Sequence, residues 1–274
     1  MKFLVPAAVV FASLFLFGCC ACDYFIPGPP TIITPTPGPY ATATPRWTPT
    51  PIRTATPVAS PTASPGSCPQ SITGCCTINS PGNYTLSADI GPFSGTCITI
   101  AQGGSGTTLD CRGHTMTGGT LASNGIVVYS EGVTVKNCVI TDCLVGLTVY
   151  YSNGGTYLNN TCSNGVGDSR GFQIEYSTGN TFTGNTANNN ANGFYFEHSG
   201  NNRMTGNTAN ENGNTGFFIT SCSGNRFTNN TATGNAGQSY SPPDFKCDMA
   251  TTINGGGNVC GHQDCGLGCG APLS

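Results

Sequence analysis

Short apolar runs recur at a fixed period through the second half of the chain. Each run starts with a glycine that is followed by an apolar, a variable and a second apolar residue, at Gly125, Gly146, Gly171, Gly193 and Gly216. The spacings between these glycines are 21, 25, 22 and 23 residues. Such alternation over a few positions is typical of a half-buried β-strand. Asn and Gly separate the runs, and both residues adopt left-handed turn conformations at low cost.

A second marker keeps the same period. An Asn recurs in each copy of a motif such as Gly179–Thr186, at positions Asn137, Asn160, Asn185, Asn207 and Asn230. The spacings are 23, 25, 22 and 23 residues, so two separate markers report one repeat. A unit of this length holds short strands but no helix, and it buries its apolar face by stacking on the next unit at ~4.8 Å. The sequence therefore predicts an all-β solenoid, a parallel β-helix.

The repeat also predicts which side chains face inward. Residues one and three positions after each marker glycine should form two core ladders, namely Ile126, Leu147, Phe172, Phe194 and Phe217, and Val128, Val149, Ile174, Phe196 and Ile219. The recurring asparagines should form another ladder at a turn, where side-chain amides bond one another and the backbone along the stack. We interpret all three ladders as structural.

The segments that precede the repeats carry a family resemblance. Ser80–Leu86 and Leu109–Gly118, followed by the repeats, resemble right-handed parallel β-helix proteins with PbH1 repeats, specifically the NosD-type group, over roughly Ser80 to Cys260. The resemblance implies a single-stranded, right-handed parallel β-helix. It implies little about function, because the group includes carbohydrate-active enzymes, surface proteins and accessory factors of copper enzymes. Asp110 and His114 belong to its pattern, which suggests a turn that bonds its own backbone, with catalysis as the alternative.

The N-terminal segment predicts export and attachment to a membrane. Lys2 precedes an apolar run from Phe3 to Phe17, and Leu16–Cys19 resembles a bacterial lipobox. We expect a lipoprotein signal peptide over residues 1–18 and lipidation at Cys19, with an uncleaved membrane anchor as the alternative. Residues 19–66 are rich in Pro and Thr and predict a disordered stalk. The β-helix domain then occupies residues 67–274.

Composition supports an exported protein whose ends are closed by disulfides. The chain has 274 residues with Cys 16 and only 8% charged residues. Many cysteines without a zinc-module pattern favour disulfides in an oxidising compartment. They should staple the first turns through Cys68, Cys75, Cys76 and Cys97, and a C-terminal cap through Cys247, Cys260, Cys265 and Cys269. A metal site formed by the last four with His262 is the alternative. The net charge of -3 gives no basic footprint for nucleic acid.

Candidate chemistry lies on one outer face of the predicted shaft. Residues two and four positions after each marker glycine should point outward and form two neighbouring columns. The column four positions after the glycine is Tyr129, Tyr150, Glu175, Glu197 and Thr220. The column two positions after it is Val127, Thr148, Gln173, Tyr195 and Phe218. Glu175 and Glu197 would lie about 5 Å apart, the carboxylate separation of retaining glycoside hydrolases. Neighbouring aromatic rings can stack on sugar faces.

Three interpretations of this face stay open. The first is ligand binding, with Tyr129, Tyr150, Glu175, Tyr195, Glu197 and Phe218 as the contact residues. The second is catalysis by Glu175 and Glu197, and the third is an ordinary solvated surface. Ice binding through Thr183, Thr205 and Thr228 is disfavoured because Arg203 and Arg226 interrupt the neighbouring column.

We expect neither a metal nor a cofactor, because copper needs clustered soft or imidazole ligands and His114, His198 and His262 are far apart in the sequence. The sequence favours a lipid-anchored protein of the cell envelope or cell surface that binds polysaccharide or a partner protein along its shaft. A polysaccharide lyase or glycoside hydrolase is the alternative.

Lipidation at Cys19 is testable on the mature protein. Because the Gly18–Cys19 junction follows the apolar run, mass spectrometry should find a diacylglyceryl adduct on an N-terminus that begins at Cys19. Recovery of an intact Met1 N-terminus from the membrane fraction would contradict the lipoprotein prediction and favour the uncleaved anchor.

Overall fold

A computed structural model describes residues 66–235, 244–263, 265–267 and 269. The expected signal peptide, the lipidation site at Cys19 and the stalk up to residue 65 lie outside the described residues. Within the described part of the chain, no helix is long and apolar enough to cross a membrane.

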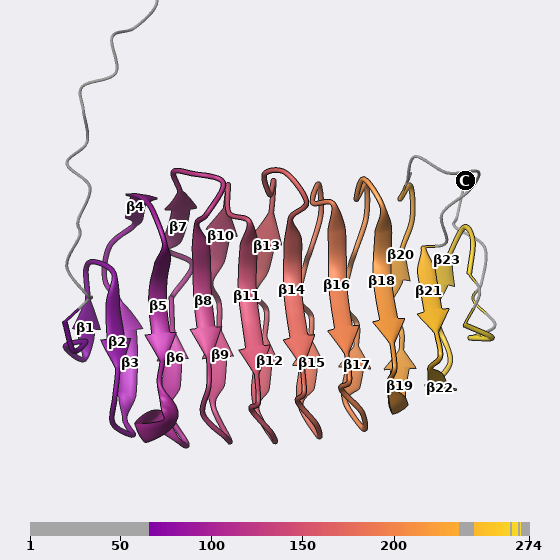
Figure 1. Ribbon diagram of the computed structural model, residues 1–274, viewed down its shortest axis with the longest axis horizontal. Coiled ribbons are helices and arrows are strands. Elements are labelled where there is room, and N and C mark those ends of the chain that lie inside the picture. The colour runs from indigo at the N-terminus through magenta and orange to yellow at the C-terminus, as the bar shows by residue number, and fades with distance from the viewer. Residues whose placement is uncertain (1–65, 236–243, 264, 268, 270–274) are drawn as a thin grey trace, which may run out of the picture. The chain divides into compact units, whose positions relative to one another are not determined.

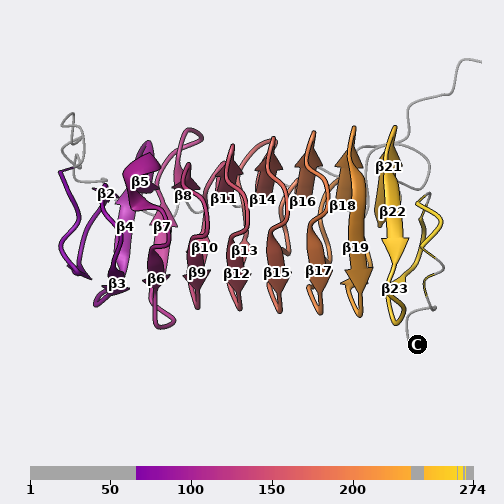
Figure 2. The ribbon, with the colours of Figure 1, turned by 90° about the horizontal axis from the view of Figure 1, so that it is seen from below.

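The described residues form a parallel β-helix whose coils stack side by side along one axis (Figures 1 and 2). One wall, here called sheet A, contains eight parallel strands in the order of the chain. They are β2 (Cys76–Ile78), β5 (Thr96–Ile100), β8 (Asn124–Val128), β11 (Val145–Tyr150), β14 (Arg170–Glu175), β16 (Asn192–Glu197), β18 (Thr215–Thr220) and β21 (Phe245–Asp248). The strands are short because each crosses only one wall of a coil.

Two further walls complete each coil. Sheet B has nine strands: β1 (Ser71–Ile72), β3 (Asn83–Leu86), β6 (Thr108–Asp110), β9 (Thr134–Lys136), β12 (Thr156–Leu158), β15 (Thr181–Thr183), β17 (Arg203–Thr205), β19 (Ser223–Thr228) and β22 (Thr251–Asn254). The third wall contains β4 (Ile90–Phe93), β7 (Thr115–Gly118), β10 (Val139–Thr141) and β13 (Thr161–Ser163), then single bridges, then β20 (Thr231–Ala232) and β23 (Val259–Cys260). A short 3-10 helix, η1, covers Gln102–Gly104.

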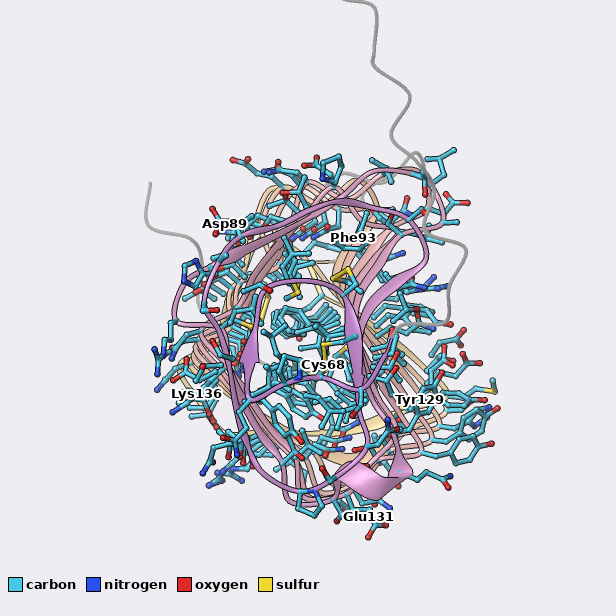
Figure 3. The ribbon with its side chains drawn as sticks, turned by 90° about the vertical axis from the view of Figure 1, so that its left-hand side faces the viewer. Cys68, Asp89, Phe93, Tyr129, Glu131 and Lys136 are labelled. Atoms are coloured by element: carbon cyan, nitrogen blue, oxygen red, sulfur yellow. A yellow bond between two sulfur atoms is a disulfide. The ribbon has the colours of Figure 1, made fainter. Side chains whose placement is uncertain are left out.

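The winding is right-handed, as the family resemblance implied. In Figure 1 the strands of sheet A run downward on the near side while the chain advances to the right. Figure 3 views the same molecule from its N-terminal end, with Tyr129 beyond sheet A on the right and Lys136 of sheet B on the left. The chain therefore turns clockwise as it recedes from the viewer, which is the sense of a right-handed helix.

The two predicted apolar ladders form the core. Ile126, Leu147 and Phe172 on neighbouring rungs have no exposed surface, and the same holds for Val128, Val149 and Ile174. The phenylalanines of the first ladder stack face to face, with ring centroids 4.5 Å apart for Phe172 and Phe194 and 4.8 Å apart for Phe194 and Phe217. The stack continues from Phe217 to Phe245 at 4.6 Å. Parallel strands in register place identical side chains above one another, and this allows the rings to stack.

Buried asparagines run through the coils in three ladders, of which sequence analysis found one. The predicted ladder contains Asn160, Asn185, Asn207 and Asn230, and Asn258 extends it by one rung. In it each side-chain Oδ1 accepts the backbone N–H of the preceding rung, as in the 2.9 Å bond from Asn160 N to Asn185 Oδ1. Each Nδ2 donates to a backbone carbonyl of the preceding rung, as in the 2.8 Å bond from Asn185 to Tyr157 O. The other ladders are Asn180, Asn202 and Asn225, and Asn190, Asn212 and Asn235.

The assignment of Asn137 to the first ladder is wrong. Lys136 pairs with Leu158, so Asn137 lies opposite Asn159, and Cys138 takes the place opposite Asn160. The backbone N–H of Cys138 donates to Asn160 Oδ1 at 3.1 Å, whereas Asn137 has a φ of 56° and turns its amide toward Asp110. Two adjacent asparagines, Asn159 and Asn160, made the sequence alignment ambiguous by one residue.

Disulfides close both ends of the shaft, as predicted. The first turns hold the bridges Cys68–Cys76 and Cys75–Cys97, and the C-terminal cap holds Cys247–Cys265 and Cys260–Cys269. A fifth bridge joins Cys111 and Cys138 between adjacent coils.

Asp244 ends the third asparagine ladder inside the cap: its carboxylate accepts N–H groups of Asn235, Gly261 and His262. In the cap, a carboxylate therefore accepts the N–H groups of the last rung, in the place where another coil would have supplied an asparagine amide.

Candidate functional site

The outer face of sheet A carries the two predicted columns in the predicted register. Glu175 on β14 pairs with Glu197 on β16, and Tyr150 pairs with Glu175 one rung earlier. The neighbouring column runs through Val127, Thr148, Gln173, Tyr195, Phe218 and then Lys246. Tyr129 follows the end of β8 and meets Tyr150 edge to face at 6.1 Å between ring centroids. In Figure 3 Tyr129 stands outside the shaft on this face.

A groove of about 300 Å³ lies over β5, β8, β11 and β14. Small side chains form part of its lining, and Tyr129, Tyr150 and Glu175 line it as well. The remaining lining residues are Thr96, Asn124, Val127, Val145, Thr148 and Gln173. Half of the predicted contact residues therefore meet at one groove on the N-terminal half of the face.

Of the other predicted contact residues, Tyr195 and Phe218 form an aromatic pair on the following rungs and Glu197 bonds the Tyr195 hydroxyl. The rings of Tyr195 and Phe218 lie 5.2 Å apart between centroids. The Arg170 guanidinium lies 4.4 Å from the ring centre of Tyr195, and the Lys246 ammonium lies 5.3 Å from that of Phe218. These cation–π contacts cover ring surface that we had expected to be open. Arg170 was not predicted because it precedes its marker glycine, and Lys246 was not predicted because its rung has Asp244 where the other rungs have a marker glycine.

Both carboxylates of the face are held by hydrogen bonds within their own strands. Gln173 donates to Glu175 at 2.5 Å and accepts from Arg170 at 3.3 Å. The Tyr195 hydroxyl donates to Glu197 at 3.3 Å. Burial raises the pKa of Tyr195, and the negative charge of Glu197 raises it further, so this phenol stays protonated and remains a donor at neutral pH.

A column of aromatic residues at the adjoining corner was not predicted. Tyr151, Tyr176 and His198 come directly after the outer column, are exposed, and have φ values of 48°, 49° and 48°. The rings of Tyr151 and Tyr176 stack at 4.9 Å, and those of Tyr176 and His198 at 5.1 Å. We call these three residues the corner ladder. The signal was present in the sequence at five positions after each marker glycine, but turns are normally recognised by Asn or Gly.

Asp110 bonds the backbone of its own turn, as the resemblance suggested, whereas His114 bonds Asp89 on the neighbouring coil. Asp110 Oδ1 accepts from the backbone N–H of Arg112 at 2.9 Å and from Asn137 at 3.0 Å, and its Oδ2 lies 3.3 Å from the Lys136 ammonium. Partial burial raises the pKa of Asp110, but these partners outweigh it and lower the pKa overall. His114 bonds Asp89 at 3.1 Å. Each group thus has a different structural partner.

The fold and the columns on its surface define a parallel β-helix protein with a polar and aromatic face. The profile of the family described as periplasmic copper-binding protein (NosD) matches residues 69–247, and the chain belongs to this family. A comparison with curated proteins gave no match.

Several solved structures are similar at low identity. The enzymatically active domain of tailspike protein 2 from bacteriophage CBA120 has a TM-score of 0.49 at 13% identity, over 68% of this chain and 35% of that one. The A-module of mannuronan C-5 epimerase AlgE4 from Azotobacter vinelandii has a TM-score of 0.34 at 14% identity, over 68% of each chain. Pectate lyase Pel9A has a TM-score of 0.29 at 14% identity, over 70% of this chain and 71% of that one. This chain thus spans about a third of the tailspike domain, and these likenesses carry no argument about function.

The described residues do not fit the copper site that the family description implies. Copper is held by clustered thiolates, thioethers or imidazoles, and no group of three or more His, Cys, Asp or Glu side chains in the described part of the chain could hold a metal ion. The free thiols of Cys143, Cys162 and Cys222 are buried, and burial raises the pKa of Cys143 to about 12, so it stays a protonated thiol. His114 pairs with Asp89 and His198 stacks on Tyr176.

The paired carboxylates should contribute little to folding. Glu175 and Glu197 lie on the outer face, and glutamine keeps the carbonyl oxygen that accepts their hydrogen bonds. We expect Glu175→Gln with Glu197→Gln to change the free energy of unfolding by no more than about 0.5 kcal/mol, as measured by thermal unfolding. A loss of several kcal/mol would show that these side chains support the core and that their outward placement is wrong.

Proposed function

We propose that this protein binds an uncharged polysaccharide along the outer face of sheet A. The observation that carries the proposal is the groove lined by Tyr129, Tyr150 and Glu175. Its volume of about 300 Å³ is at the lower end for ligand sites, and its lining combines two aromatic rings with several polar side chains. The rings offer apolar surface to the faces of sugar rings. The side chains of Glu175, Gln173 and Asn124 offer hydrogen-bond partners to sugar hydroxyls.

The charges on the face support an uncharged ligand. Glu175 lies in the groove and Glu197 lies one rung further along the shaft. The nearest cations, Arg170 and Lys246, lie over the rings of Tyr195 and Phe218. A polymer of uronic acids would bring further negative charge to a face that already carries paired carboxylates, and like charges held close together repel one another.

A carbohydrate-active enzyme, either a polysaccharide lyase or a glycoside hydrolase, is the second candidate. The observation that favours it is the direct pairing of Glu175 with Glu197 across adjacent strands. Bond cleavage by such a pair requires one carboxyl group to donate a proton and the other to act as base or nucleophile. Both side chains already accept hydrogen bonds from neighbours in their own strands, which favours binding over catalysis.

The proposed site of action is the cell envelope or cell surface. The five disulfides indicate an extracytoplasmic location, since such bonds persist in oxidising compartments. A lipid anchor at Cys19 would hold the protein at the membrane, and the Pro- and Thr-rich residues 19–66 would separate the shaft from it. On this proposal the β-helix presents its polysaccharide-binding face outside the membrane. A surface protein bound along the same face is the other partner that the sequence suggested.

Affinity electrophoresis of the full-length protein tests the proposal. Gels containing hydroxyethylcellulose, galactomannan or glycol chitin should include at least one that retards the protein, while polygalacturonate and alginate gels should not. Tyr129→Ala with Tyr150→Ala should weaken retardation about ten-fold or more, because two ring contacts are lost. Leu121→Ala is the control, since Leu121 is 69% exposed and does not line the groove.

Two results would contradict the proposal. One is migration unchanged by every neutral polysaccharide. The other is release of reducing or unsaturated sugar ends by the wild-type protein with loss of that release in Glu175→Gln, which would establish the enzyme instead.

A further inference from the structure

The corner ladder occupies backbone positions that are unfavourable for its residues. Tyr151, Tyr176 and His198 all have left-handed φ values, and the column continues to Ser221 at 52° and Met249 at 48°. The left-handed region costs an ordinary L-residue roughly 1–2 kcal/mol, and a bulky residue there is uncommon. Such positions persist where the surrounding structure or a function requires them.

The same chain uses residues better suited to this conformation at another left-handed corner. After sheet B the equivalent positions on five successive rungs are Asn137, Asn159, Gly184, Gly206 and Asn229, with φ between 52° and 62°. Asn and Gly are the residues that tolerate this conformation best. The repeat can therefore turn a corner with Asn or Gly. Folding alone gives no reason for Tyr, Tyr and His at the corner beside the groove.

The corner ladder contacts the groove through one ring. Tyr150 lines the groove, and its ring lies 4.6 Å from Tyr151 at an angle of 84° and 6.1 Å from Tyr176 at 89°. With Tyr129 at 6.1 Å and 89°, three rings surround Tyr150 at nearly right angles. Edge-to-face contacts of this kind restrict the orientation of a side chain that is otherwise free to change rotamer. The corner rings themselves remain open to solvent, with Tyr151 57% exposed and Tyr176 42% exposed.

We infer that Tyr151 and Tyr176 are positioning residues of the polysaccharide site: they hold the ring of Tyr150 in the orientation that the groove requires. The inference rests on the proposed function, because it assigns the corner ladder to the same groove. A fixed ring loses little conformational entropy when a sugar binds, and this increases affinity. The ladder thus accounts for aromatic residues that the backbone conformation disfavours.

The test separates ring contacts from backbone effects. Tyr151→Asn with Tyr176→Asn removes both rings and places a residue suited to the left-handed region at both positions. Tyr151→Phe with Tyr176→Phe keeps the rings and removes the hydroxyls. Ser221→Asn is the matched control, since Ser221 occupies the same column two rungs beyond Tyr176 without a ring. Each full-length variant is measured by thermal unfolding and by affinity electrophoresis in the three neutral polysaccharides named above.

We expect the Asn pair to keep or raise the midpoint of thermal unfolding, because Asn adopts the left-handed conformation at lower cost than Tyr. Retardation should weaken about ten-fold, because the ring of Tyr150 is no longer held in one orientation. The Phe pair should bind within about two-fold of wild type, since the edge contacts survive. Ser221→Asn should keep or raise the midpoint without altering retardation.

The inference is overturned if the Asn pair is retarded as strongly as wild type although the double variant Tyr129→Ala with Tyr150→Ala has lost retardation. In that case the proposed function survives. It is also overturned if the Asn pair unfolds at clearly lower temperature, because the rings would then serve stability. Loss of retardation in the Phe pair would show that the hydroxyls contact the polysaccharide themselves. Absence of retardation in the wild-type protein would remove the proposed function, and the ladder's role with it.

Discussion

Hydrogen bonds from buried asparagine side chains to the next coil are the interaction on which the rest of this structure depends. From Cys138 onward, successive coils have a corner where a backbone N–H group inside the shaft is bonded by a side chain and not by a strand, and an unpaired buried N–H costs about 1–3 kcal/mol. Asn160, Asn185, Asn207 and Asn230 bond these groups in one ladder: each Oδ1 accepts an N–H of the coil before it, and each Nδ2 donates to the asparagine Oδ1 of the coil after it. The ladders therefore fix the register between coils as well as the turn itself.

Fixed register is what gives the outer surface its columns. Because strands repeat without a shift along β11, β14, β16 and β18, residues at one position of the repeat lie in a row on the outside. A row of identical positions can hold rings in contact, as in the core stack of phenylalanines and in the exposed corner ladder. The groove forms where the small side chains of Val127 and Thr148 in one column lie beside Tyr129 and Tyr150 in the next. The proposed binding face is thus a direct result of how the coils are locked together.

The alternation of apolar and other residues within each strand, together with the marker glycines, was enough to predict the architecture, the core ladders and the pairing of Glu175 with Glu197. They could not place Asn137, because a neighbouring asparagine on the next rung allowed two alignments. The corner ladder was missed for a physical reason: Tyr and His at positive φ leave no compositional trace of a turn. The cation over Tyr195 was missed because Arg170 reaches that ring from another column and another rung, and the cation over Phe218 was missed because the rung of Lys246 has no marker glycine to place it in the column. Contacts between rungs depend on side-chain direction, which the repeat pattern does not contain.

Equilibrium unfolding of Asn185→Ala tests the central claim most directly. Asn185 is fully buried, and its loss leaves the N–H of Asn160 and the carbonyl of Tyr157 without their side-chain partner. The account predicts a loss of about 3 kcal/mol, the cost of two orphaned buried groups, while Asn189→Gly, at an exposed left-handed position, should change stability little. An Asn185→Ala protein within about 0.5 kcal/mol of wild type would contradict the claim that the asparagine ladders hold the coils in register.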